Sequence, residues 1–188
     1  MDTPQTQSEI VSALAEQQSA SMDYWTAFDT GSFFRAIGES WSPAETVRHL
    51  TKSTRPVVQA LTLPKLLLRL RFGRSKRPSV AYDDLRARYR EQLAAGGKAG
   101  RFAPSSQSES DLEAWRKKIL ATYTQVNEDL RKAIGRWSEQ SLDQLQLPHP
   151  LLGNLTVREM LFFTLYHQRH HMDVVRRHLT EDAGARIQ

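Results

Sequence analysis

Near its C-terminus the chain reads His167-Gln168-Arg169-His170-His171, inside a long segment whose apolar residues recur with a helical period. The apolar stripe of that segment consists of Val157, Met160, Leu161, Thr164, Val174 and Val175. His167 and His171 are four residues apart, so a helix stacks both imidazoles on one face, and that face is the apolar stripe. Two inward-facing imidazoles need a polar partner, and a divalent cation is the partner that this spacing favours.

A third ligand has to come from another segment, and His49 is the candidate. Its neighbours Thr46 and Ser53 form a polar strip beside an apolar stripe, although His49 lies off the centre of that stripe. The chain has no cysteine, so only histidine, carboxylate and water are available as ligands. The alternative is a pair of histidines that are hydrogen-bonded in a polar core, because many helices carry two histidines at this spacing by chance.

The other histidines are expected outside the ligand set. His178 lies about 10 Å along the helix from His171, too far to share one ion. His170 is turned away from the stripe, and His149, between two prolines, is expected at the rim of the site. Gln168 occupies the position where a zinc protease of the HExxH type carries its catalytic glutamate, which excludes that class.

The pattern of apolar residues predicts an all-α fold, a four-helix bundle in one domain over residues 1–188. The core helices are expected at residues 5–29, 43–62, 110–137 and 155–179. Between the second and third helices, residues 64–107 form an insertion with a short apolar and basic piece, a helix from Tyr82 to Leu93 and a Gly-rich loop. Strand signals are weak, because the chain has little β-branched alternation and no Asn-Gly or Asp-Gly turn.

Three of these helices begin with sequences typical of a capping box. The pairs are Ser42 with Glu45, Ser110 with Glu113, and Thr156 with Glu159. Pro43 suits the first position of the second helix, and Pro56 is expected to kink or end it.

Composition narrows the class of protein. No apolar run is long enough to cross a bilayer, and residues 1–12 lack the basic start and apolar block of a signal peptide, so a cytoplasmic location is expected. The net charge is +5, and much of the basic excess lies between Lys65 and Arg77. A basic cluster of this kind can bind phosphates or anionic lipid, or it can be a solvated loop or short helix. No motif that reads DNA or RNA accompanies it.

Three blocks of the sequence resemble the DinB/YfiT superfamily. Trp41-Ser42-Pro43-Ala44-Glu45, followed by His49-Leu50, resembles the start of the family's second helix. The stretch from His149 to Thr156 resembles the approach to its last helix, and residues 167–171 resemble its closing HxxxH motif. The blocks occur in the family's order and anchor most of the chain between Trp41 and Leu179.

The resemblance implies an up-down-down-up four-helix bundle, often a homodimer, with one divalent metal ion on His49, His167 and His171. The ion is commonly zinc or nickel. Two features depart from the family pattern: the segment from Leu61 to Ser106 is longer and more basic, and is expected to cover or reshape the cleft, and position 173 is Asp.

Three functions are compatible with the sequence. The first is a metal-dependent enzyme on a small-molecule substrate, either an S-transferase that uses a low-molecular-weight thiol, as the resemblance implies, or a hydrolase. The second is a metal-binding protein without turnover, for example a stress-related one. The third is an interaction module that uses Lys65–Arg77 on an anionic partner. The sequence shows no clear general base, since Glu45 is better placed to cap its own helix than to orient His49.

Overall fold

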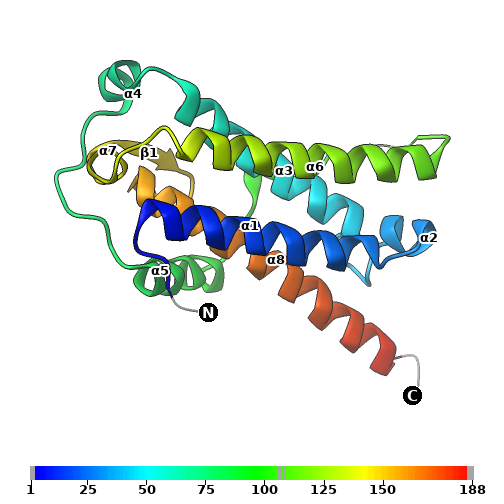
Figure 1. Ribbon diagram of the computed structural model, residues 1–188. Helices are drawn as coiled ribbons and strands as arrows, with labels where there is room; N and C mark the ends of the chain where they lie inside the picture. Colours follow the sequence, from blue (N-terminus) through cyan, green and yellow to red (C-terminus); the bar gives the residue numbers. More distant parts are fainter. Residues whose placement is uncertain (1–2, 106, 108, 186–188) are drawn as a thin grey trace.

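Four long helices form the body of the protein (Figure 1). The computed structural model describes residues 3–105, 107 and 109–185 of the chain, so the ends of the expected 1–188 domain lie outside the described residues. The long helices are α1 (Gln7–Thr26), α3 (Pro43–Thr62), α6 (Leu112–Ile134) and α8 (Val157–Ala185). The all-α four-helix bundle is therefore confirmed, whereas its up-down-down-up order stays a prediction.

Local sequence determines where these helices begin and end. The capping boxes at Ser42 and Thr156 form as expected, with Glu45 and Glu159 completing them. The box expected at Ser110 was wrong, because Asp111 caps α6 and Glu113 instead accepts a hydrogen bond from the Thr30 hydroxyl.

Three expected helix ends differ from the structure. The first helix ends at Thr26 rather than at residue 29, because Asp29 caps a further short helix, α2 (Thr30–Phe34). The third ends at Ile134 rather than at residue 137, and the last continues to Ala185 rather than ending at residue 179. The second helix has the expected bounds, Pro43–Thr62, so Pro56 does not end it.

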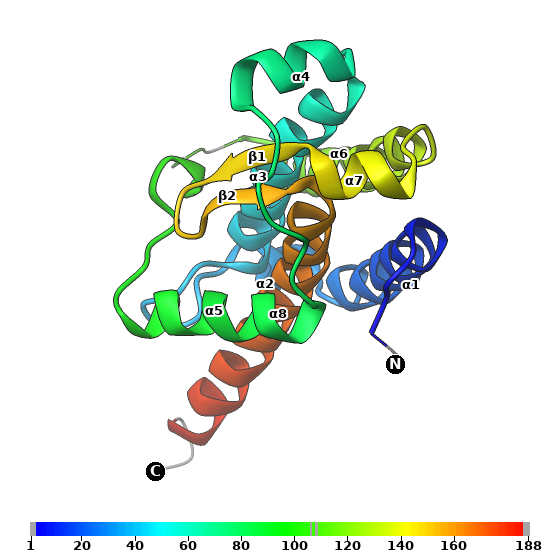
Figure 2. The same ribbon diagram turned by 90° about the vertical axis from the view of Figure 1, so that its left-hand side faces the viewer.

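The insertion between α3 and α6 is folded onto one end of the bundle (Figure 2). It contains α4 (Lys65–Phe72), α5 (Tyr82–Ala94) and the 3₁₀ turn η1 (Gly100–Phe102). Helix α5 packs against α8, where Tyr89 meets the Phe163 ring edge-on at 5.0 Å between centroids. The insertion is therefore part of the structure around the C-terminal helix.

A short β-hairpin lies between α6 and α8, after α7 (Glu139–Gln144). Strands β1 (Gln146–His149) and β2 (Gly153–Thr156) pair antiparallel, and the all-helical pattern did not predict them. Their turn ends at Gly153, whose φ of +72° favours glycine. The His149 imidazole closes the turn, because its Nδ1 accepts hydrogen bonds from the backbone N–H groups of Leu151 and Leu152.

The core consists of two apolar clusters. One lies under α4, α5 and the hairpin, and the other lies toward α2, around Trp25, Phe33 and Tyr123. None of the helices among the described residues combines the length and apolar character that a membrane-spanning segment requires.

Glu159, in the first turn of α8, anchors the insertion to the bundle. Its side chain is fully buried. The carboxylate accepts hydrogen bonds from the two terminal guanidinium nitrogens of Arg77 and from the backbone N–H groups of Val80 and Thr156. Burial alone would raise its pKa, but the hydrogen bonds from Arg77 and the two backbone groups outweigh burial and lower it.

Replacing this carboxylate should destabilise the fold. We expect Glu159→Ala to lower the free energy of unfolding by about 3 kcal/mol, because the two buried N–H groups and Arg77 lose their acceptor. Urea unfolding measures the change. The matched control is Asp173→Ala, which removes a carboxylate that is 64% exposed and paired with Arg176. The control substitution should lower the free energy of unfolding by less than about 0.5 kcal/mol. An equal decrease in the two variants would contradict the anchoring role of Glu159.

Candidate metal centre

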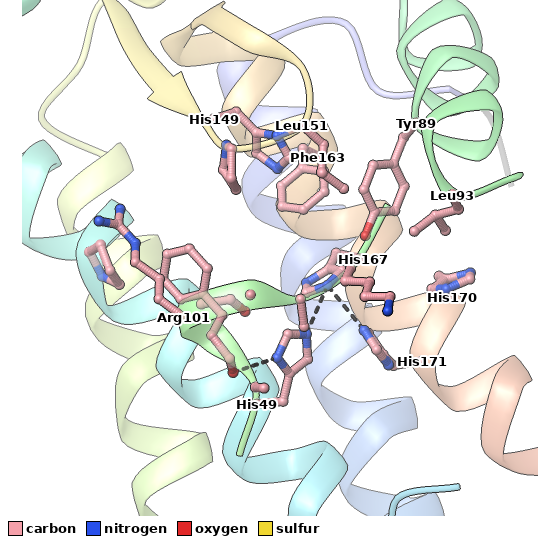
Figure 3. A pocket seen from close by; sticks show the side chains of 18 of the residues that line it. His49, Tyr89, Leu93, Arg101, His149, Leu151, Phe163, His167, His170 and His171 are labelled. Atoms are coloured by element: carbon pink, nitrogen blue, oxygen red, sulfur yellow. Dashed lines mark hydrogen bonds between the residues drawn. The ribbon is translucent and has the colours of Figure 1, made fainter. Parts of the chain in front are cut away.

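Three histidines from two helices meet at the contact between α3 and α8. In Figure 3, His49 of α3 points toward His167 and His171 of α8. The Nε2 atom of His167 lies 3.1 Å from the Nε2 atom of His49 and 3.1 Å from that of His171. One ring nitrogen from each histidine lies within 4.8 Å of the other two. The structure thus brings together the three residues that the sequence singled out.

A backbone carbonyl of the insertion orients His49. The Phe102 oxygen lies 2.9 Å from His49 Nδ1, and a carbonyl only accepts, so Nδ1 carries the proton. The Nε2 atom of the neutral ring therefore presents its lone pair to the other two histidines. Lys52 and Arg48 hold the same loop on α3 by donating to the carbonyls of Ala103 and Ser105.

Sequence reasoning missed the role of Phe102, because a backbone oxygen has no sequence signature. The only available signal was that the insertion would cover or reshape the cleft.

Aromatic rings hold two of the imidazoles in place. Trp41 stacks on His171 with ring centroids 6.0 Å apart, and Phe163 stacks on His167 at 4.8 Å. Trp41 also lies 5.0 Å from the His49 ring. The residue directly before the Ser42 cap therefore forms a wall of the site, which gives the Trp41–Glu45 block a second physical role.

The surroundings of the three histidines keep their imidazoles neutral. Burial lowers the pKa of His167 and of His171 well below 6.5, and the neighbouring imidazoles lower both further. Burial also lowers the pKa of His49, although its hydrogen bond to the Phe102 carbonyl opposes that effect. Neutral imidazoles are the form that binds a metal ion.

The donor set fits a divalent ion. Zn–N bonds of about 2.0–2.1 Å at tetrahedral angles place ligand nitrogens about 3.3 Å apart, close to the 3.1 Å separations here. Three neutral nitrogen donors without a thiolate suit zinc, nickel and similar ions. The triad can therefore hold a metal.

The remaining histidines lie around the triad or beyond it. His170 lines the same cavity without joining the close cluster, and His149 lies at the rim beside Phe163, at 4.2 Å between ring centroids. His178 is absent from both the cluster and the cavity lining.

Gln168 faces away from the triad, toward α6. It is buried, accepts from the Tyr123 hydroxyl and donates to the Asn127 amide oxygen. The residue between the ligand candidates thus has a structural role in the core. Glu45 completes the helix cap, and Asp173 is exposed and bonded to Arg176.

A cavity of about 570 Å³ opens onto the triad. Its walls come from α3, α5, η1, the hairpin and α8, and most of the lining side chains are apolar or aromatic. Among the described residues, Lys98 and Arg101 are the only lysine and arginine that line it, and none of the lining residues is an aspartate or a glutamate. Burial raises the pKa of the lining residue Tyr89 to about 12, so that its hydroxyl stays protonated.

Comparisons with known proteins agree with this fold. A model of the DinB superfamily matches residues 13–175. TT2238, a solved four-helix bundle protein, is similar with a TM-score of 0.56 at 15% identity, over 92% of this chain and 99% of that one.

A second solved structure is YfiT from Bacillus subtilis, described as a probable metal-dependent hydrolase with an unusual four-helix bundle topology. It is similar with a TM-score of 0.55 at 14% identity, over 95% of this chain and 86% of that chain. At these identities both structures show the fold alone. No curated protein matches the sequence.

Acid should destabilise the protein partly through His149. Burial lowers the pKa of His149 from 6.5 to about 4 in the folded state. The unfolded state therefore binds more protons below pH 6.5, and stability falls as the pH decreases from 6.5 to about 4.

The variant His149→Asn removes this titration and retains an acceptor oxygen for the turn. Urea unfolding of chelator-treated protein measures the loss of stability between about pH 7.5 and about pH 5. We expect that loss to be about 2 kcal/mol smaller in the variant. An equal loss in both proteins would show that His149 is not buried in its neutral form.

Proposed function

Because the chain belongs to the DinB superfamily, we propose that it is a divalent-metal-dependent enzyme that acts on a small molecule, as an S-transferase that uses a low-molecular-weight thiol. The observation that carries the proposal is the opening of the histidine triad onto an apolar cavity of about 570 Å³. A metal site with a purely structural role is closed by its ligands, whereas a catalytic one keeps a position open toward its substrate.

We assign His49, His167 and His171 as the ligands, with zinc or nickel as the ion. Three imidazoles leave a further position for substrate. When bound, such an ion supplies Lewis acidity, which lowers the pKa of a coordinated water or thiol toward neutrality. The protein's part is to hold the imidazoles: the Phe102 carbonyl fixes the tautomer of His49, and Trp41 and Phe163 fix the rings of His171 and His167.

The side chains around the cavity favour a thiol over water as the nucleophile. Metal-dependent hydrolysis commonly uses a carboxylate base beside the ion, and in the part of the chain that the structure describes no carboxylate lines this cavity. A thiol has an ordinary pKa of about 8.5 and needs much less help to lose its proton. Burial lowers the pKa of His170, so its ring is neutral. Because the His170 ring lies 5.2 Å from that of His171, we assign it as the group in the cavity that accepts that proton at a ring nitrogen.

The cavity also suggests the kind of substrate. Apolar walls favour a molecule with an apolar body, and Lys98 and Arg101 at the lining favour an anionic group on it. A carboxylated thiol and an apolar electrophile meet these requirements together.

A metal-dependent hydrolase is the second candidate, supported by the similarity in fold to YfiT. A metal-binding or stress-related protein without turnover is the third. In each case we expect a homodimer, as the resemblance of the sequence blocks implies, and a cytoplasmic location, as the composition of the chain predicts.

The first test is metal content. The purified protein should bind about one divalent ion per chain, and the double variant His167→Ala/His171→Ala should bind none, because one imidazole cannot hold the ion alone. Elemental analysis by mass spectrometry measures this, and circular dichroism checks the helical content. The controls His170→Ala and His178→Ala should keep their metal. Full occupancy in the double variant would exclude this ligand set.

The second test is turnover. Metal-loaded protein is mixed with a panel of carboxylated low-molecular-weight thiols and an apolar electrophile, and thioether formation is followed by mass spectrometry. We expect product only with thiol and metal together, and a fall of about 100-fold in rate for His170→Ala at unchanged metal content. Consumption of an ester or amide substrate without thiol would instead support the hydrolase.

A further inference from the structure

Exposed leucines gather on the outward face of α4. Leu66, Leu67 and Leu70 of the helix are 63, 51 and 75% exposed, and Leu63, two residues before the helix, is 43% exposed. These are four of the six large apolar side chains that are exposed among the described residues. On the opposite face of α4, Leu68 is buried and Phe72 packs against the core. The helix is thus held to the protein by one face and presents leucines on the other.

Arginines flank the leucine stripe on both sides. At about 100° of rotation per residue, the three leucines of this face within the helix, Leu66, Leu67 and Leu70, span an arc of about 100°. Arg69 lies about 60° beyond one edge of the arc and Arg71 about 40° beyond the other. An apolar stripe bordered by cations is typical of helices that lie in the interface of a membrane.

The segment of sequence that contains α4 carries no acidic residue. The sequence from residue 46 to residue 82 contains nine lysines and arginines and no aspartate or glutamate. Among the described residues, no ion pair involves a basic side chain between Lys65 and Lys76. The partner of this face should therefore supply the negative charge.

The charge and shape of α4 indicate which kind of partner can bind its outer face. A second copy of the chain placed symmetrically on this face would bring Arg69 and Arg71 of both copies together without a counter-charge. Helix α4 also projects from one end of the bundle as a ridge rather than a groove (Figures 1 and 2). A ridge with apolar and cationic side chains suits a flat, deformable, anionic surface.

We propose that the outer face of α4 docks the protein on an anionic membrane surface. Leu66, Leu67 and Leu70 enter the boundary between headgroups and acyl chains, and Arg69 and Arg71 bind lipid phosphates. The helix has only eight residues, so the attachment is peripheral and reversible. It does not depend on the metal centre or on the proposed enzymatic reaction.

Co-sedimentation of the full chain with vesicles tests the proposal. One set of vesicles is phosphatidylcholine alone, and the other also contains phosphatidylglycerol. We expect binding to the anionic vesicles to be at least about tenfold tighter and to weaken as salt is added. Binding that is equal for both vesicle types, or absent, would overturn the proposal.

Two pairs of substitutions locate the binding face. Leu66→Ser/Leu70→Ser should weaken binding to the anionic vesicles by at least about tenfold, and Arg69→Gln/Arg71→Gln should remove most of the preference for them. The matched controls change exposed residues elsewhere: Leu112→Ser/Leu179→Ser and Arg35→Gln/Arg88→Gln. The controls should bind as the unchanged chain does, and equal losses in test and control pairs would overturn the assignment to α4.

A parallel measurement separates this proposal from the alternatives. An acidic amphipathic peptide that binds α4 while vesicles do not would identify a protein partner and exclude the membrane. Metal content, measured in every variant, should stay unchanged, so failure of membrane binding and failure of the proposed metal site can be told apart.

Discussion

The contact between α3 and α8 places three imidazoles side by side, with His49 and His167 buried and His171 partly buried, and much of the surrounding structure follows from that burial. Neutral imidazoles in an apolar environment still need partners for their ring nitrogens. The Phe102 carbonyl satisfies Nδ1 of His49, which leaves the Nε2 atoms facing one another. Stacked rings on both sides prevent the imidazoles from turning toward solvent. A cation at this point would give the three imidazoles a common partner.

The insertion between α3 and α6 links this site to the rest of the fold. Its last part supplies the Phe102 carbonyl and the cationic lining of the cavity, and its middle part, α5, forms a wall through Tyr89. Arg77 fastens it to the buried Glu159 at the start of α8. The insertion, in which the sequence predicted one helix at Tyr82–Leu93 and which was expected to cover or reshape the cleft, therefore completes the site that the long helices begin.

Local signals were sufficient to predict the bundle and two of the three ligand candidates. The HxxxH spacing and the apolar stripe placed His167 and His171 together, and the boxes at Ser42 and Thr156 marked two helix starts correctly. His49 was harder to predict as a ligand, because its neighbour His167 is 118 residues away in the sequence. His49 also lies off the centre of the apolar stripe of its own helix. The neighbouring residues Ser110 and Asp111 are both good caps, and tertiary contacts rather than local preference decide between them.

The β-hairpin and the Phe102 carbonyl could not have been predicted in this way. The hairpin turn depends on His149 as an acceptor instead of on an Asn-Gly pair, and its strands are short and carry no regular alternation. Every residue type has a backbone carbonyl, so the identity of residue 102 gives no signal. Only the path of the folded loop shows that this oxygen contacts His49.

The charges of the chain are unevenly distributed, and this asymmetry connects the cavity with α4. Residues 46–82 hold nine of the 26 basic residues and none of the 21 acidic ones, so the remainder of the chain carries a net charge of −4. Lys98 and Arg101 place positive charge at the cavity, while Glu159 is paired with Arg77 and Asp143 with Arg158. Unpaired cationic side chains attract anions. An anionic substrate at the cavity and anionic lipid at α4 are both consistent with this attraction, and they require no contact in common.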